Sequence, residues 1–163
     1  MSDCLVFAEE ELCIVNKEDR WKLFIVDDDK DIHEITKIAL KDLKFKNKAI
    51  SFESAFSAEE AISKLKNNSQ FAIVLLDIGM ETSDAGLDVA NFIRQQQQDR
   101  LTRIIIRTGQ PGNISEKEIL NNYDINGYQS KIDPNLDHFY TSIHTAISQY
   151  HQISELANVN NIL

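Results

Sequence analysis

The sequence predicts an α/β fold built on a parallel sheet, because short apolar runs alternate with segments of helical period from Trp21 onward. The strand candidates are residues 23–26, 49–54, 71–76, 103–106 and 127–129. The first, third and fourth are continuous apolar runs, which is typical of strands buried on both faces of a sheet. The second alternates apolar and polar residues and therefore suits an edge of the sheet.

Helices are expected after each strand. The first helix has an apolar stripe made of Ile32, Ile35, Ala39 and Leu43. The second follows a capping box formed by Ser57 and Glu60. The third is expected over residues 86–97, with the glutamine run 95–98 as its solvated end.

The last two helices also carry start signals. Ser115 and Glu118 form a second capping box. Asp133 and Pro134 are typical of an N-cap and a first helical residue. The buried face of the last helix is predicted to contain Leu136, Tyr140, Ile143, Ile147 and Tyr150. The spacing of Phe139, Ile143, Ala146, Tyr150, Ile153 and Ala157 fits an ordinary amphipathic helix or, alternatively, a coiled-coil connector.

Length and composition restrict the class of protein. The 163 residues suit one domain, over residues 21–155, with an acidic arm at 1–20 and a helix end or linker at 156–163. A net charge of -9 argues against a surface that binds nucleic acid or anionic lipid directly. No apolar run has the length of a membrane span, and Cys4 and Cys13 fit no metal or disulfide pattern. We therefore expect a cytoplasmic protein.

Polar residues follow four of the five strand candidates. Asp27 and Asp28 come after the first strand, Asp77 after the third, Thr108 after the fourth and Lys131 after the fifth. Ligand sites in open parallel sheets lie at the carboxyl ends of the strands, so these side chains are expected on one rim. Carboxylates can hold Mg²⁺ and can accept a phosphoryl group, while an ammonium neutralises the phosphoryl oxygens.

Four segments in this order resemble the receiver domain of two-component response regulators: "IVDDD", "VLLDIGM", "RTGQ" and "GYQSK". The resemblance covers residues 21–155. It implies a flavodoxin-like, doubly wound sheet of five parallel strands in the order 2-1-3-4-5, with five helices. It also implies a signalling domain that catalyses only its own phosphorylation and dephosphorylation and is not otherwise an enzyme.

The same resemblance implies a role for each site residue. Asp77 would accept the phosphoryl group. Asp28 would bind Mg²⁺ directly and Asp27 through water, and the backbone carbonyl of Gly79 would complete the protein's share of the metal shell.

Thr108 and Lys131 would bind the phosphoryl oxygens. Tyr128 would change rotamer as Thr108 moves, and Thr108 and Tyr128 together would form the switch.

The resemblance also implies partners. The phosphoryl group would come from a sensor histidine kinase or a phosphotransfer protein, and the response would pass to a fused or separate output domain. A homodimer through the fourth helix, fifth strand and fifth helix is a further expectation. The segments "RTGQP" and "DIHEITKIAL" resemble receivers found upstream of cyclic-di-GMP enzymes.

Two positions depart from the family pattern. Glu81 stands where the family usually has proline, in a loop that is one residue longer. Ile132 follows Lys131 in place of another proline, so a cis peptide there would cost about 3 to 4 kcal/mol.

Two other functions are alternatives for this sequence. In a haloacid-dehalogenase-type phosphatase, Asp27 would be the nucleophile and Asp29 the general acid and base. In a pseudo-receiver, the domain would bind partners without phosphorylation. Asp29 and Asp31 are otherwise first-turn acids of the first helix, and His33 is expected to have no catalytic task.

Overall fold

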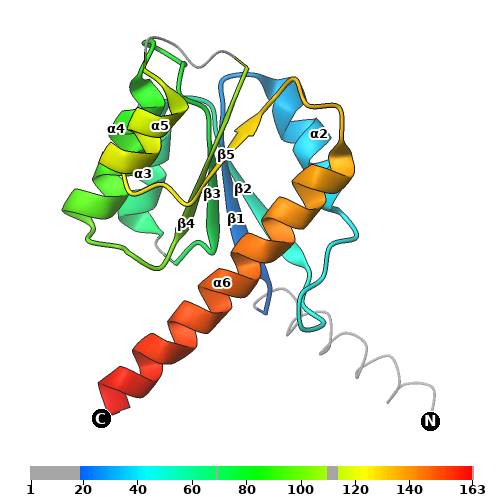
Figure 1. Cartoon of the computed structure of the whole chain (residues 1–163), viewed down its shortest axis with the longest axis vertical. Coiled ribbons are helices and arrows are strands. Elements are labelled where there is room, and N and C mark those ends of the chain that lie inside the picture. The colour runs from blue at the N-terminus through cyan, green and yellow to red at the C-terminus, as the bar shows by residue number, and fades with distance from the viewer. Residues whose placement is uncertain (1–18, 69, 110–113, 163) are drawn as a thin grey trace.

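A computed structural model describes residues 19–68, 70–109 and 114–162, so Cys4, Cys13 and the acidic arm up to residue 18 lie outside the described residues. Five parallel strands form one sheet in the order β2-β1-β3-β4-β5, which confirms the predicted strand order (Figure 1). The strands are β1 (Trp21–Val26), β2 (Ile50–Ala55), β3 (Ile73–Leu76), β4 (Arg103–Thr108) and β5 (Gly127–Ser130).

Helices cover both faces of the sheet (Figure 1). One face carries α2 (Lys30–Leu40) and α6 (Leu136–Ile162). The other carries α3 (Ala58–Asn67), α4 (Ala85–Asn91) and α5 (Glu116–Asn122). Phe24 and Val26 belong to the core on the second side, whereas Leu23 and Ile25 belong to the core beneath α2 and α6. This alternation explains why β1 needs apolar residues at successive positions.

The buried face of α2 differs from the predicted stripe. His33, Thr36 and Leu40 are buried, whereas Ile35 is 45% exposed. The two buried polar side chains are tolerated because both are hydrogen-bonded. His33 contacts Ser54 Oγ through Nδ1 at 3.0 Å and the carbonyl oxygen of Asp27 through Nε2 at 2.7 Å. The prediction for Ile35 was therefore wrong, since these contacts set the orientation of the helix.

The third predicted helix changes its hydrogen-bonding pattern before it ends. The α-helix α4 stops at Asn91 and continues as a π-helical turn, η1 (Phe92–Gln96). Gln97 then donates from Nε2 to the carbonyl oxygen of Leu65 at 2.8 Å. The glutamine run is therefore not wholly solvated as predicted, because one of its members ties η1 to α3.

Arg94 anchors the π-helical turn to the loop before β5. Its buried guanidinium donates to the carbonyl oxygens of Asp99 at 2.7 Å and Asp124 at 3.1 Å, and to Asn126 Oδ1 at 2.7 Å. Asn126 Oδ1 also accepts from the backbone N–H of Ile104, so Arg94 connects η1 to the loop before β5 and, through Asn126, to β4.

We expect Arg94→Met to lower the free energy of unfolding by about 2 to 4 kcal/mol, because three part-buried hydrogen bonds lose their charged donor. Arg100→Met, which alters an exposed side chain, is the matched control and should change stability by less than about 0.5 kcal/mol. Urea denaturation measures both values. Equal midpoints for the two variants would contradict the anchoring role of Arg94.

The helix α6 begins two residues later than predicted. Asn135, rather than Asp133, receives the backbone N–H groups of Asp137 and His138 at its Oδ1 atom, at 3.1 and 3.3 Å. Ile143 and Ile147 are buried as predicted, but Leu136 is 53% exposed and Tyr140 is exposed, contrary to the prediction, because Phe139 takes the buried position in the first turn. The buried positions of α6 are Phe139, Ile143, Ala146 and Ile147.

The first half of α6 is therefore occupied by its own sheet and cannot serve as a coiled-coil seam at those positions. Leu156 and Val159, farther along the helix, are exposed. None of the helices in the described ranges combines the length and hydropathy needed to cross a membrane.

Candidate functional site

Asp27 and Asp77 lie at the carboxyl ends of neighbouring central strands. The backbone N–H of Asp27 donates to the carbonyl oxygen of Ala55 at 3.1 Å, and that of Asp77 donates to the carbonyl oxygen of Val26 at 2.9 Å. These bonds extend the ladders of β1 and β3 by one residue. Both side chains are buried, with 3% of Asp27 and 6% of Asp77 exposed. The sheet thus fixes two carboxylates side by side.

Lys131 bridges the two carboxylates. Its Nζ lies 2.6 Å from Asp27 Oδ2 and 3.0 Å from Asp77 Oδ2. The end of β5 positions it, because the backbone N–H of Lys131 donates to the carbonyl oxygen of Thr108 at 3.1 Å. Thr108, the last residue of β4, is buried, and its hydroxyl is hydrogen-bonded to Asp77. The predicted convergence of these four residues on one rim is present in the structure.

Opposing effects act on the pKa values of Asp77 and Lys131. Burial and the charge of Asp27 raise the pKa of Asp77 above its ordinary value, although Lys131 and Thr108 act in the opposite direction. Burial alone would lower the pKa of Lys131, but its hydrogen bond to Asp27 and the charges of Asp77 and Asp27 raise it. One ammonium therefore does not fully compensate the carboxylates around it.

The same rim offers a ligand set for a divalent cation. Carboxylate oxygens of Asp27, Asp28 and Asp77 all lie within 4.8 Å of one another. Asp28 is exposed and the other two are buried, so the cluster opens to solvent on one side. Hard carboxylate ligands with room for water match the preference of Mg²⁺. Gly79, the fourth predicted ligand, is in the loop after β3 and is half-buried.

Gly86 lets α4 approach the end of β3. The backbone N–H of Gly86 donates to the carbonyl oxygen of Ile78 at 2.8 Å. A Cβ at this position would overlap the carbonyl oxygen of Asp77 and would lie 2.8 Å from its carbonyl carbon. Only glycine allows this contact, so Gly86 helps to place the backbone of Asp77. Gly86 was not among the predicted site residues, since nothing in the neighbouring sequence indicates that the end of a distant strand lies against it.

Glu81 caps a neighbouring helix. Its Oε1 and Oε2 atoms accept from the backbone N–H of Ala58 at 2.9 and 3.1 Å. A carboxylate at the N-terminus of α3 is favourable for its unpaired N–H groups and for the helix dipole. The residue that replaces the family's usual proline therefore ties the loop after β3 to α3.

The geometry disfavours the phosphatase alternative. Asp29, which would be the general acid and base, is the N-cap of α2 and accepts from the backbone N–H of Asp31 at 2.9 Å. Asp27 Oδ1 accepts from the backbone N–H of Asp29 at 2.9 Å, while Oδ2 contacts Lys131. Asp29 thus has a structural role that explains its position.

Tyr128 is half-buried on β5, where it packs against the core beneath α3, α4 and α5. Burial and the charge of Glu116 raise the pKa of its hydroxyl. The peptide between Lys131 and Ile132 is trans.

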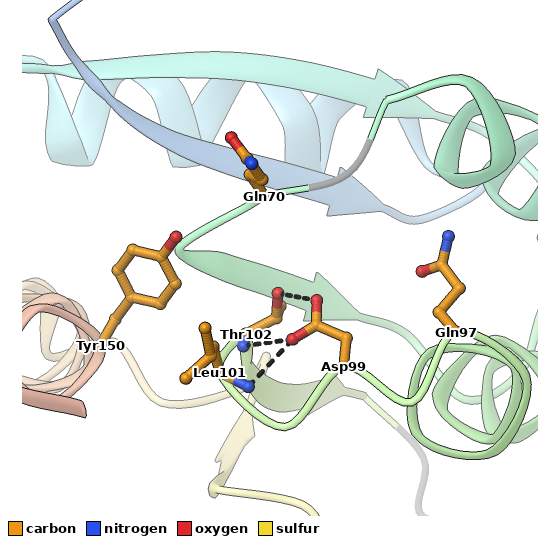
Figure 2. Close-up of a pocket in the computed structure, with 6 residues that line it drawn as sticks. All are labelled: Gln70, Gln97, Asp99, Leu101, Thr102 and Tyr150. Atoms are coloured by element: carbon orange, nitrogen blue, oxygen red, sulfur yellow. Dashed lines mark hydrogen bonds between the residues drawn. The ribbon is translucent and has the colours of Figure 1, made fainter. Parts of the chain in front are cut away.

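A cleft of about 400 Å³ lies at the opposite, amino end of the strands. Figure 2 shows its lining: Gln70, Gln97, Asp99, Leu101, Thr102 and Tyr150. Asp99 accepts from the backbone N–H groups of Leu101 and Thr102 at 2.9 and 3.0 Å, and from the Thr102 hydroxyl at 2.6 Å. Its carboxylate therefore shapes the turn before β4, and the cleft is separate from the acid cluster.

The chain is similar to a known protein family and to a curated relative. The family model described as response regulator receiver domain matches residues 23–136. A curated relative, a 3'3'-cGAMP-specific phosphodiesterase 2 from Vibrio cholerae, is 32% identical over 146 residues. The match covers 90% of this chain and 28% of the relative, so the chain spans less than a third of that protein's length.

Solved structures show the same fold. A response regulator receiver domain protein from Methanospirillum hungatei JF-1 has a TM-score of 0.65 and 22% identity, with 82% of this chain and 98% of that chain covered. The signal receiver domain of an HD domain-containing protein from Pseudomonas fluorescens Pf-5 has a TM-score of 0.70 and 21% identity, with coverages of 84% and 93%. With the family model matching most of its length, the chain belongs to the response regulator receiver domains of two-component signalling systems.

Proposed function

We propose that Asp77 is the phosphoacceptor of this receiver domain and that Asp27, Asp28, Asp77 and the carbonyl of Gly79 hold the Mg²⁺ ion. The observation that carries the proposal is the buried Asp77 carboxylate, 3.0 Å from Lys131 Nζ and within the three-carboxylate cluster. When bound, Mg²⁺ supplies positive charge to the carboxylates and to the transferring phosphoryl oxygens. We propose residues 21–155 as the functional unit.

The transfer forms one bond and breaks one. A carboxylate oxygen of Asp77 attacks the phosphorus of a phosphohistidine, and an O–P bond forms as the P–N bond breaks. The bonding electron pair leaves with the imidazole, which then takes up a proton. Lys131 contacts Asp77, and the Thr108 hydroxyl lowers the pKa of Asp77, so both side chains are near enough to bind the phosphoryl oxygens. Hydrolysis of the acyl phosphate returns the carboxylate and inorganic phosphate.

The response would pass through β4 and β5. Thr108 would move toward the phosphoryl group, and Tyr128 would repack against the core to which it already belongs. The surface formed by α5, β5 and α6 would then change, which is also where we place a homodimer contact. A sensor histidine kinase or phosphotransfer protein in the cytoplasm would be the donor. By analogy with the curated phosphodiesterase, the output is an enzyme domain, and the receiver itself has no further activity.

The test is the intact mass of the protein after incubation with Mg²⁺ and acetyl phosphate. Wild type is expected to gain one phosphoryl group, and Asp77→Asn is expected to gain none. Asp27→Asn should be phosphorylated more slowly, because it keeps the acceptor and loses one metal ligand.

Asp42→Asn, an exposed acid outside the cluster, is the matched control and should behave as wild type. A phosphoryl group that persists in Asp77→Asn but disappears in Asp27→Asn would favour the phosphatase instead. The absence of any adduct in wild type would leave a pseudo-receiver that binds partners without phosphorylation.

A further inference from the structure

Arg107 lies beside the two site carboxylates on the same face of the sheet. Val26 pairs with Leu76 and Leu76 pairs with Ile106, so the next position in register aligns Asp27, Asp77 and Arg107 across β1, β3 and β4. Adjacent strands are about 4.8 Å apart, and residues aligned in register project to the same side. The guanidinium therefore belongs to the side of the sheet covered by α2 and α6.

The guanidinium is buried and incompletely paired. Arg107 is 8% exposed, and its Nη1 donates to the hydroxyl of Thr36 at 2.7 Å. Its Cζ lies 4.2 Å from the ring centroid of Phe139, which is a cation–π contact with α6. The Nε atom is buried and has no hydrogen-bond partner in the part of the chain that the structure describes.

No carboxylate within the described ranges lies within 4.0 Å of this guanidinium, so its charge is not neutralised by a direct ion pair. Burying an unpaired charge is costly. Burial accordingly lowers the pKa of Arg107, and the charge of Asp27 opposes that effect. The negative charge of the acid cluster offsets part of the cost of burying this cation.

A cavity of only about 10 Å³ is lined by these groups together. Its polar lining consists of Asp27, Asp77, Thr36 and Arg107. A water molecule needs roughly this much space, so no layer of solvent fits between the guanidinium and the carboxylates. Buried charges are screened much less than exposed ones. The field of Arg107 therefore acts on the acid cluster with little attenuation.

We propose that Arg107 is a positioning residue for phosphoryl acceptance. It is a second fixed cation next to Asp27 and Asp77. Its charge weakens the binding of Mg²⁺ and stabilises the negative charge that is added when Asp77 is phosphorylated. The proposal rests on the proposed function of Asp77. Lys131 contacts the carboxylates directly, whereas Arg107 acts on them through space. The two cations together offset two of the three acidic charges in the cluster.

The test uses two probes of opposite charge on Arg107→Met. One is Mg²⁺ alone, measured by titration calorimetry. The other is beryllium fluoride, an anionic mimic of the phosphoryl group, measured at saturating Mg²⁺. We expect the Kd for Mg²⁺ to fall by about 3- to 10-fold and the Kd for beryllium fluoride to rise by a similar factor. A general loss of structure would weaken both.

Three controls separate charge from packing. Arg107→Lys keeps the charge and should restore both affinities to within about twofold of wild type. Thr36→Val removes the hydrogen bond at Nη1 but keeps the charge, and should also change neither affinity by more than about twofold. Arg103→Met alters a half-buried arginine at the other end of β4, which donates to the carbonyl oxygens of Leu101 and Arg100, and should match wild type.

Any pattern other than opposite shifts in Arg107→Met overturns the proposal. Weakened binding of both probes in Arg107→Met and Arg107→Lys would assign a packing role to the residue. If wild type gains no phosphoryl group from acetyl phosphate while the opposite shifts are observed, the phosphoacceptor function fails and the charge effect of Arg107 stands.

Discussion

Replacing Gly86 with alanine is expected to lower the free energy of unfolding by about 3 kcal/mol and to disrupt phosphoryl acceptance at Asp77. The added Cβ would overlap the carbonyl oxygen of Asp77 and would lie 2.9 Å from the Cα atom of Ile78. Both obstacles are backbone, so no side-chain rotation can relieve them. Either α4 must move away from β3, or the end of β3 must move and take the carboxylate with it.

Gly79→Ala is the matched control, because its Cβ would have its nearest contact at 3.8 Å, with the carbonyl oxygen of Ser83. That distance is ordinary van der Waals contact, and the backbone carbonyl that we propose as a metal ligand is retained. Urea denaturation of the two variants, followed by the intact-mass assay with acetyl phosphate, measures both effects. A Gly86→Ala protein as stable as Gly79→Ala would show that α4 can shift freely.

Lys131→Met is expected to destabilise the metal-free protein by about 3 kcal/mol at neutral pH. The substitution leaves two buried carboxylates adjacent without the ammonium that now bridges them at 2.6 and 3.0 Å. Mg²⁺ should restore part of the loss, because a cation that binds only the folded state stabilises it, and this stabilisation grows with the logarithm of the ratio of its concentration to its Kd. The gain in stability from Mg²⁺ should therefore be larger in Lys131→Met than in wild type.

Thermal unfolding with Mg²⁺ and with a chelator gives the four values needed for this comparison. Lys44→Met, at an exposed position after α2, controls for the loss of a surface charge and should respond to Mg²⁺ as wild type does. An equal response to Mg²⁺ in Lys131→Met and wild type would mean that the lysine and the metal do not compete for the same carboxylates.

The central strands of the sheet, and the polar residues at their carboxyl ends, could be predicted from the sequence. Continuous apolar runs identified the central strands, and the geometry of parallel strands then required Asp27, Asp77, Thr108 and Lys131 to meet. The receiver resemblance supplied the strand order, which is confirmed. These features depend on local pattern and on chain order, and both can be followed in a sequence.

Features that depend on contacts between distant elements were not predictable. The stripe through Ile35 was wrong because Thr36 and His33 find polar partners on β4, β2 and the end of β1, and those partners make the more polar face the buried one. No role was predicted for Arg107, which directly follows the predicted strand 103–106, since nothing near it in the sequence reveals its burial against Phe139.

The backbone hydrogen bonds that hold the site residues are expected to open at different rates. The amide protons of Asp27 and Asp77 belong to hydrogen bonds of the central strands, so they exchange with solvent only when the middle of the sheet opens. Lys131 instead follows β5, a four-residue edge strand whose side chains are half-buried or exposed. The carboxylates of Asp27 and Asp77 are thus attached to the part of the sheet expected to exchange slowest, whereas Lys131 follows the strand expected to open most readily. A change in the charge of Asp77 is consequently expected to displace Lys131 and the β4–β5 edge farther than the backbone of β1 and β3.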